Sequence, residues 1–83
     1  MVTKKITIKI PSGLDARPAA LLVQVASQYE SSIYIECEEK KINAKSIMGM
    51  MSLGLMEDDE VVVTADGADE TEAVESMAKL LNR

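Results

Sequence analysis

Histidine is absent from the 83-residue chain, and cysteine occurs once, at Cys37. The lack of histidine removes the most common general base and the most common metal ligand. A single cysteine cannot form an internal disulfide or a multi-cysteine metal site, and it is compatible with a reduced cytoplasmic setting. We therefore expect no metal site and no cofactor, and we expect Cys37 to be a small core residue.

Aromatic residues are also scarce, with two tyrosines and neither phenylalanine nor tryptophan. The core must come from aliphatic residues and six methionines, whose side chains adapt to irregular shapes. There is no long apolar run, so neither a signal peptide nor a membrane span is expected. The net charge of −5 disfavours direct binding to nucleic acid, but it is compatible with a role through a DNA-binding partner.

Periodic patterns predict a single domain, residues 1–83, with the order β-α-β-β-α-β-α. Ile6, Ile8 and Ile10 alternate with polar residues, as in a half-buried strand, and a helical stripe runs from Ala16 to about Tyr29. This order favours a two-layer α+β fold in which three helices cover one face of a four-stranded sheet. The remaining elements are predicted over residues 33–37, 40–44, 46–53, 60–66 and 69–83.

Two acidic segments are explained by local structure, one by helix capping and the other by a turn. Asp69 and Glu72 form the D-x-x-E pattern of a capping box before the last helix. The charge run MEDDE (56–60) is expected to be a solvated turn, because its carboxylates lack the spacing of a calcium loop.

The segment GLDARPAALL (13–22) combines a turn, a candidate N-cap and an apolar helix. Asp15 is a good N-cap because its carboxylate accepts hydrogen bonds from the free amides of the first turn, where Pro18 is also tolerated. Those amides and Arg17 also favour an anion site. The charge of Asp15 would partly fill that anion site. Because aspartate is among the best N-cap residues, capping is favoured over a catalytic role for Asp15.

Ser46 precedes a short apolar helix in KSIMGMMSL (45–53), which makes it a candidate N-cap. A phosphate there would add about −1.5 to −2 charge at the positive end of the helix dipole without unfolding the domain. Such a site suits a switch that changes surface charge. Lys45 and Lys41 are candidates to lie near the phosphate.

The helix after Ser46 is apolar on nearly all sides. Either its neighbours enclose it, or part of it is exposed as a docking surface. We favour the second alternative, because so small a domain has little else to enclose these residues and exposed methionines are typical of adaptable binding surfaces. The apolar set comprises Ile47, Met48, Met50, Met51 and Leu53.

Three segments carry a resemblance to a known family. GLDARPAALLVQ (13–24) resembles the G-[IL]-H-A-R-P-A segment of HPr, the histidine-containing phosphocarrier of the bacterial sugar phosphotransferase system. KSIMGMMSLG (45–54) resembles the segment around the regulatory serine of that family, and GADE (67–70) also matches. The resemblance implies an open-faced β-sandwich with an antiparallel sheet of strand order 1-4-2-3.

The sequence departs from the family pattern at Asp15, which stands in place of the active histidine. A non-histidine residue there, together with the retained serine, is similar to the catabolite-repression branch of the family, the HPr-like Crh branch. The resemblance implies that histidine phosphotransfer is lost and that the chain is a regulator rather than an enzyme. The alternative is a phosphocarrier that works through an acyl phosphate on Asp15.

The resemblance also implies the partners. HPr kinase/phosphorylase would phosphorylate Ser46, and the product would act as corepressor for catabolite control protein A, a LacI-type repressor. A homodimer formed by exchange of the first strand is a further expectation, with the segment IPSGL (10–14) as its hinge. The residues implied to bind partners are Asp15, Arg17, Ala20, Gln24, Ile47, Met48 and Met51.

Overall fold

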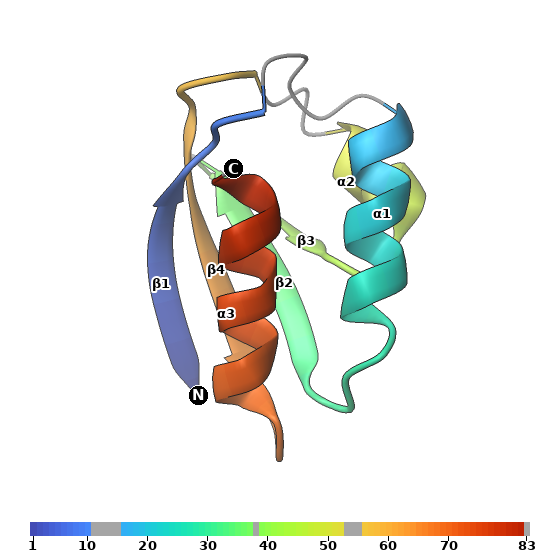
Figure 1. The fold of residues 1–83 in the computed structure, drawn as a ribbon, viewed down its shortest axis with the longest axis vertical. Coiled ribbons are helices and arrows are strands. Elements are labelled where there is room, and N and C mark those ends of the chain that lie inside the picture. Colours follow the sequence, from blue (N-terminus) through green and yellow to red (C-terminus); the bar gives the residue numbers. More distant parts are fainter. Residues whose placement is uncertain (11–15, 38, 53–55, 83) are drawn as a thin grey trace.

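The computed structural model describes residues 1–10, 16–37, 39–52 and 56–82, with the backbone alone for residues 16–18. The chain forms four strands and three helices within this part (Figure 1). The strands are β1 (Val2–Thr7), β2 (Ser32–Cys37), β3 (Lys40–Asn43) and β4 (Glu60–Asp66). The helices are α1 (Ala16–Ala26), α2 (Ile47–Ser52) and α3 (Glu70–Leu81).

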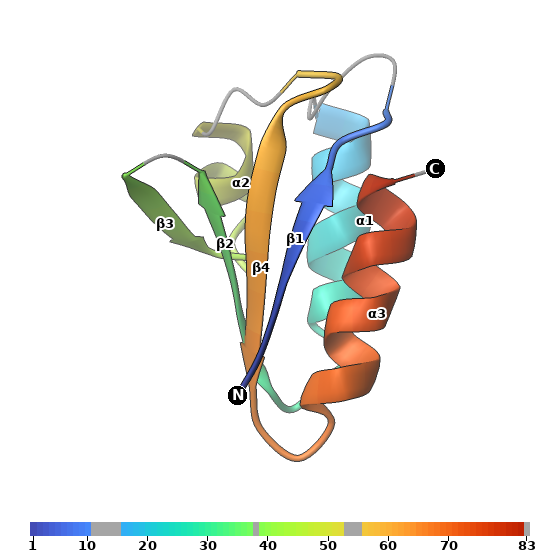
Figure 2. The same ribbon diagram turned by 90° about the vertical axis from the view of Figure 1, so that its left-hand side faces the viewer.

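The sheet is antiparallel throughout and has the order β1-β4-β2-β3. Helices α1 and α3 pack side by side on one face of the sheet, and α2 packs against α1 close to β3 (Figure 2). The predicted two-layer α+β fold and its strand order are therefore confirmed. Strands β1 and β3 form the two edges of the sheet.

Alternation along the strands places their apolar residues in one core. Ile33 and Ile35 of β2 are fully buried, as are Val63 and Ala65 of β4, because successive strand residues point to opposite faces. Cys37 is half-buried and packs against this core, in agreement with the prediction. The helical contribution to the core comprises Ala19, Leu22, Ala26, Met50, Ala73, Val74, Met77 and Leu81.

The first strand and first helix are shorter than the pattern predicts. Strand β1 ends at Thr7, although Ile8 remains fully buried and its N–H donates to the carbonyl of Asp59 at 2.8 Å. Helix α1 ends at Ala26 rather than near Tyr29, where the chain turns toward β2. The MEDDE segment forms the predicted turn, exposed except for half-buried Asp59, and its last residue, Glu60, begins β4.

The capping box predicted at Asp69 and Glu72 is wrong. The Asp69 side chain makes no hydrogen bond to the N-terminus of α3. It reaches the loop between α1 and β2, where it accepts hydrogen bonds from the N–H of Glu30 and the N–H of Ser31, both at 3.0 Å, and from the Ser31 hydroxyl at 2.5 Å. The Ser31 hydroxyl and the backbone donors favour the charged carboxylate and hold the pKa of Asp69 below its usual value.

Gly67 makes a second contact at this junction. A Cβ atom placed on Gly67 would lie 2.6 Å from the Cα of Ser31, so only glycine allows the β4–α3 turn to approach this loop so closely. The start of α3 is thus fastened to the α1–β2 loop by backbone packing and by the Asp69 carboxylate.

Candidate functional site

Ser46 is exposed and caps helix α2, as predicted. Its hydroxyl oxygen accepts a hydrogen bond from the N–H of Gly49 at 3.2 Å, and its carbonyl accepts one from the N–H of Met50 at 3.0 Å. Asn43 fixes the approach to the helix, because its side-chain oxygen accepts from the N–H of Lys45 at 2.8 Å. The Ser46 hydroxyl therefore lies on a fixed backbone while remaining open to solvent.

The apolar residues of α2 divide between the core and the surface. Met50 is fully buried, whereas Met48 is 81% exposed, Met51 47% and Ile47 42%. A six-residue helix has too few turns to place all of its apolar side chains on one face. The prediction that part of this set faces outward is confirmed, and Leu53 lies outside the described residues.

Helix α1 extends this surface because it packs against α2. Ala20 and Gln24, both predicted to bind partners, are exposed. Leu21 is also exposed, at 38%, and the sequence reasoning missed it. The signal was present, because Leu21 falls outside the buried stripe of Ala19 and Leu22 and precedes Gln24 by three residues on the same helical face.

The structure gives Lys45 and Lys41 other partners than those predicted. The ammonium group of Lys45 donates to the carbonyl of Tyr29 at 2.9 Å, and the ammonium group of Lys41 lies 5.0 Å from the ring centroid of Tyr34. Neither ammonium group forms an ion pair among the described residues. The structure therefore does not show these two ammonium groups gathered at the Ser46 hydroxyl.

The hydroxyl group of Tyr29 also lies 2.5 Å from that of Ser76 on α3. Lys45, Tyr29 and Ser76 therefore form a chain of contacts from the turn before α2 to the far helix. These hydrogen bonds connect the turn before α2 to helix α3.

Some predicted site residues cannot be placed. Asp15 and residues 11–14 of the predicted hinge segment (10–14) lie outside the described residues, and nothing is described of the Arg17 side chain. In the part of the chain that the structure describes, no group of three or more acidic, cysteine or histidine residues is arranged to hold a metal ion. No helix in that part has the length and apolarity needed to cross a membrane.

Comparisons with known proteins agree with this fold. The family described as the phosphorylation site of the PTS HPr component matches residues 2–83. The HPr-like protein Crh of Bacillus subtilis is 49% identical over 78 residues, which covers 94% of this chain and 92% of Crh. The curated Crh of Halalkalibacterium halodurans is 45% identical over 83 residues and covers 100% of this chain and 99% of its own.

A solved structure shares the architecture closely. The phosphocarrier protein HPr from Bacillus anthracis superposes with a TM-score of 0.94 at 42% identity, covering 96% of this chain and 95% of that one. The match by family, by sequence over nearly the whole length and by fold leads to one conclusion. This chain belongs to the HPr family of the phosphotransferase system and is similar to its Crh members.

Proposed function

We propose that this protein is a regulator of carbon catabolite repression that is switched by phosphorylation of Ser46. HPr kinase/phosphorylase adds the phosphate, and the phosphorylated protein then acts as corepressor for catabolite control protein A. The single observation that supports this proposal most is the exposed hydroxyl of Ser46 beside the exposed side chains of Ile47, Met48 and Met51. The proposed setting is the cytoplasm, with residues 1–83 acting as one domain.

Phosphorylation at this position is compatible with the fold. The Ser46 hydroxyl is exposed and its helix is already capped, so a phosphate can extend into solvent while the ester oxygen still accepts from the Gly49 N–H. The modification adds about −1.5 to −2 charge near the start of α2, where the dipole favours negative charge. The expected result is a change in surface charge with little change in shape.

The apolar surface supplies the other half of the proposed interface. Methionine side chains adapt to more than one partner, which suits a surface that must bind both the kinase and the repressor. Ile47, Met48 and Met51 form the proposed apolar dock, and exposed Ala20 and Gln24 extend it along α1. By family resemblance, Arg17 contacts acidic groups of the repressor and Asp15 lies on the same face.

The proposal is tested by incubating the protein with HPr kinase/phosphorylase and ATP, followed by intact-mass measurement and peptide mapping. We expect one phosphate on Ser46 and none in the Ser46→Ala variant. Ser52→Ala is a matched control, because Ser52 is exposed on the same helix and its hydroxyl donates to the Gly49 carbonyl at 2.7 Å. An unmodified wild-type protein, with an HPr control labelled alongside, would disprove the proposed switch.

A second assay separates regulation from phosphotransfer. The chain contains no histidine, so enzyme I and phosphoenolpyruvate are expected to leave it unlabelled. A base-labile label on Asp15 would instead identify an acyl phosphate and support the phosphocarrier alternative. Repressor binding by Ser46-phosphorylated protein, measured by titration with catabolite control protein A, then tests the second step.

We also propose that the chain forms a homodimer by exchanging β1. The crystal structure of Crh from Bacillus subtilis is described as a swapped dimer, and it matches this chain with a TM-score of 0.78 at 47% identity, covering 98% of this chain and 93% of that one. Edge strand β1 pairs with β4 alone, so exchange would replace one set of antiparallel pairs with an identical set. Light scattering over a range of concentrations would detect the dimer, and a monomer at every concentration would exclude it.

A further inference from the structure

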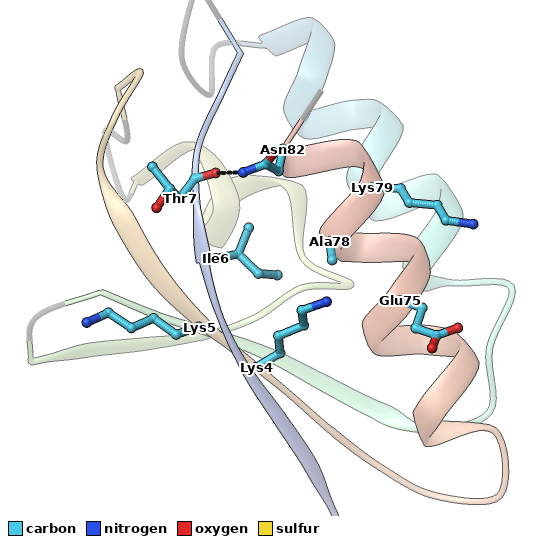
Figure 3. Close-up of a pocket in the computed structure, with 8 residues that line it drawn as sticks. All are labelled: Lys4, Lys5, Ile6, Thr7, Glu75, Ala78, Lys79 and Asn82. Atoms are coloured by element: carbon cyan, nitrogen blue, oxygen red, sulfur yellow. Dashed lines mark hydrogen bonds between the residues drawn. The ribbon is translucent and has the colours of Figure 1, made fainter.

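A groove of about 620 Å³ lies between β1 and α3, on the edge of the sheet opposite β3 (Figure 3). Buried Ile6 and half-buried Ala78 form its apolar floor. Lys4 extends toward α3 in Figure 3 and Asn82 lines the helical side, while Lys79 lies at the rim of the groove with its side chain directed away from β1. Ser46 and the exposed residues Ile47, Met48 and Met51 lie at helix α2, which packs near β3, so the groove is a separate feature of the molecule.

The backbone of β1 has one side without a neighbouring strand, and the register identifies which groups face that side. The N–H of Ile8 donates to the carbonyl of Asp59, so the backbone groups of Ile8 face the neighbouring chain. The same register runs back along β1, where Ile6 is opposite Val61. Even-numbered residues of β1 therefore direct their N–H and C=O groups toward β4, because these directions alternate along an antiparallel strand. The N–H and C=O groups of Thr3 and Lys5 consequently point outward.

The C-terminal end of α3 closes only the upper part of this edge. The side-chain amide of Asn82 donates to the carbonyl of Thr7 at 2.9 Å, and the N–H of Lys9 donates to the carbonyl of Leu81 at 2.7 Å. Within the described residues, no hydrogen bond reaches the outward backbone groups of Thr3 and Lys5. The lower part of the edge is therefore an open row of donors and acceptors beside the groove.

The groove is positively charged although the chain has a net charge of −5. Lys4 and Lys79 form no ion pair within the described part of the chain, whereas Lys5 is paired with Glu60 at 2.7 Å and points to the other face of the sheet. Glu75 contributes the single carboxylate among the lining residues. The ammonium group of Lys4 is thus free to bind a carboxylate next to the open backbone edge, and that of Lys79 is free to bind one at the rim of the groove.

We propose that the groove binds an acidic segment of a partner protein, in extended conformation, as an added strand beside β1. The outward groups of Thr3 and Lys5 supply its main-chain hydrogen bonds, as in other cases of strand addition. Every second side chain of the segment faces the groove, and this set includes an apolar side chain over Ile6 and Ala78 and carboxylates that bind Lys4 and Lys79, because Lys4 and Ile6 lie on the same face of β1. Sequence preference then comes from charge and from the alternation of side chains.

A second copy of this chain is a poorer occupant of the same edge. Antiparallel pairing of two β1 strands centred on Lys4 would bring Lys4 of one copy, which has no ion pair among the described residues, close to Lys4 of the other. Like charges on facing strands are destabilising, and lysine on an edge strand discourages self-association. Lys4 instead attracts an acidic strand.

The probe is a fluorescein-labelled hexapeptide in which threonine alternates with glutamate, valine and glutamate in turn, so that the acidic and apolar side chains face the groove together. Binding is measured by fluorescence anisotropy and by amide chemical shifts. We expect the largest shifts at Thr3 and Lys5, and unchanged signals at Ser46. The same peptide with lysine in place of glutamate is expected to bind at least about tenfold more weakly, because charge complementarity is lost. Methylation of the peptide nitrogens that face β1 is expected to abolish binding.

Variants of the protein test the charges. Lys4→Glu and Lys79→Glu are each expected to weaken peptide binding about tenfold, whereas Lys40→Glu, the same charge change on the exposed far edge β3, stays within about twofold of wild type. Thermal melting of each variant checks the fold. The proposal is overturned by no binding, by equal affinity of the methylated peptide, by shifts centred elsewhere, or by an equal effect of Lys40→Glu.

Discussion

Helices α2 and α3 both contain methionine and other apolar residues, but they differ in how many of these residues are buried. Helix α3 has 12 residues and places Ala73, Val74, Met77 and Leu81 in the core, with its charged residues outside. Helix α2 has six residues and buries Met50, while Met48 and Met51 face solvent. The longer helix contributes mainly to stability, and the shorter one also exposes apolar surface, which we propose binds partners.

The largest expected effect comes from removing the buried methionines. Met50→Ala and Met77→Ala are each expected to lower the free energy of unfolding by about 2–5 kcal/mol, because each leaves a cavity in the core. Urea denaturation followed by circular dichroism measures this loss. If Met50→Ala were nearly neutral, α2 would contribute little to the stability of the core, and α3 would be the more important of the two helices for folding.

The attachment of α3 is expected to be the next most sensitive feature. Gly67→Ala would force a Cβ atom against the backbone of Ser31, which is expected to cost about 1–3 kcal/mol in unfolding free energy. Gly49→Ala is the matched control in α2, since its Cβ would lie 3.4 Å from the nearest atom, in ordinary contact. Thermal melting compares the two, and equal melting temperatures would contradict the close packing at Gly67.

The acid stability of the domain is expected to depend on Asp69. Because the folded state lowers the pKa of this carboxyl group, its contribution is present above the unfolded pKa of about 3.9 and is lost as the pH falls through the lower folded value. Unfolding of wild type and Asp69→Asn is compared between pH 7 and pH 2, roughly the range over which a carboxylate with a lowered pKa titrates. We expect the variant to be less stable at neutral pH and to lose less stability in acid.

Glu72→Gln is the control for that experiment. It alters the other residue of the predicted capping box, and Glu72 is exposed. We expect the acid profile of this variant to follow that of the wild type. A profile like that of Asp69→Asn would restore the capping box as the explanation.

The smallest expected effect on stability is that of Met48→Ala. Because Met48 is 81% exposed, the free energy of unfolding is expected to change by no more than about 0.5 kcal/mol. Binding of the Ser46-phosphorylated protein to catabolite control protein A, measured by calorimetry, is expected to weaken. A large fall in stability would instead assign Met48 to the core and remove it from the proposed interface.

Local patterns predicted the sheet and the cap well. The alternation of Ile33 and Ile35 and the position of Ser46 before an apolar run depend on residues close in sequence, and both predictions are confirmed. The stripe on α3 is long enough for the helical period to identify its buried face. In contrast, the pattern of α2 could not indicate which methionine is buried, because a helix of six residues is too short to show a helical period.

Long-range contacts account for the predictions that were wrong. Asp69 fits a capping box locally, but Ser31 lies 38 residues earlier and offers the carboxylate both a hydroxyl and an N–H. Lys45 is adjacent to Ser46, yet its ammonium group binds the carbonyl of Tyr29. The β1–α3 groove joins the two ends of the chain, so no local motif could indicate it.

The contact of Tyr29 with Lys45 and Ser76 has a practical consequence for spectroscopy. The chain contains no tryptophan, so its intrinsic ultraviolet emission comes from Tyr29 and Tyr34 alone. A Tyr34→Phe variant would leave one native fluorophore, and that fluorophore sits where the turn before α2 meets α3. Its emission would report, without any attached label, how the domain responds when Ser46 is phosphorylated.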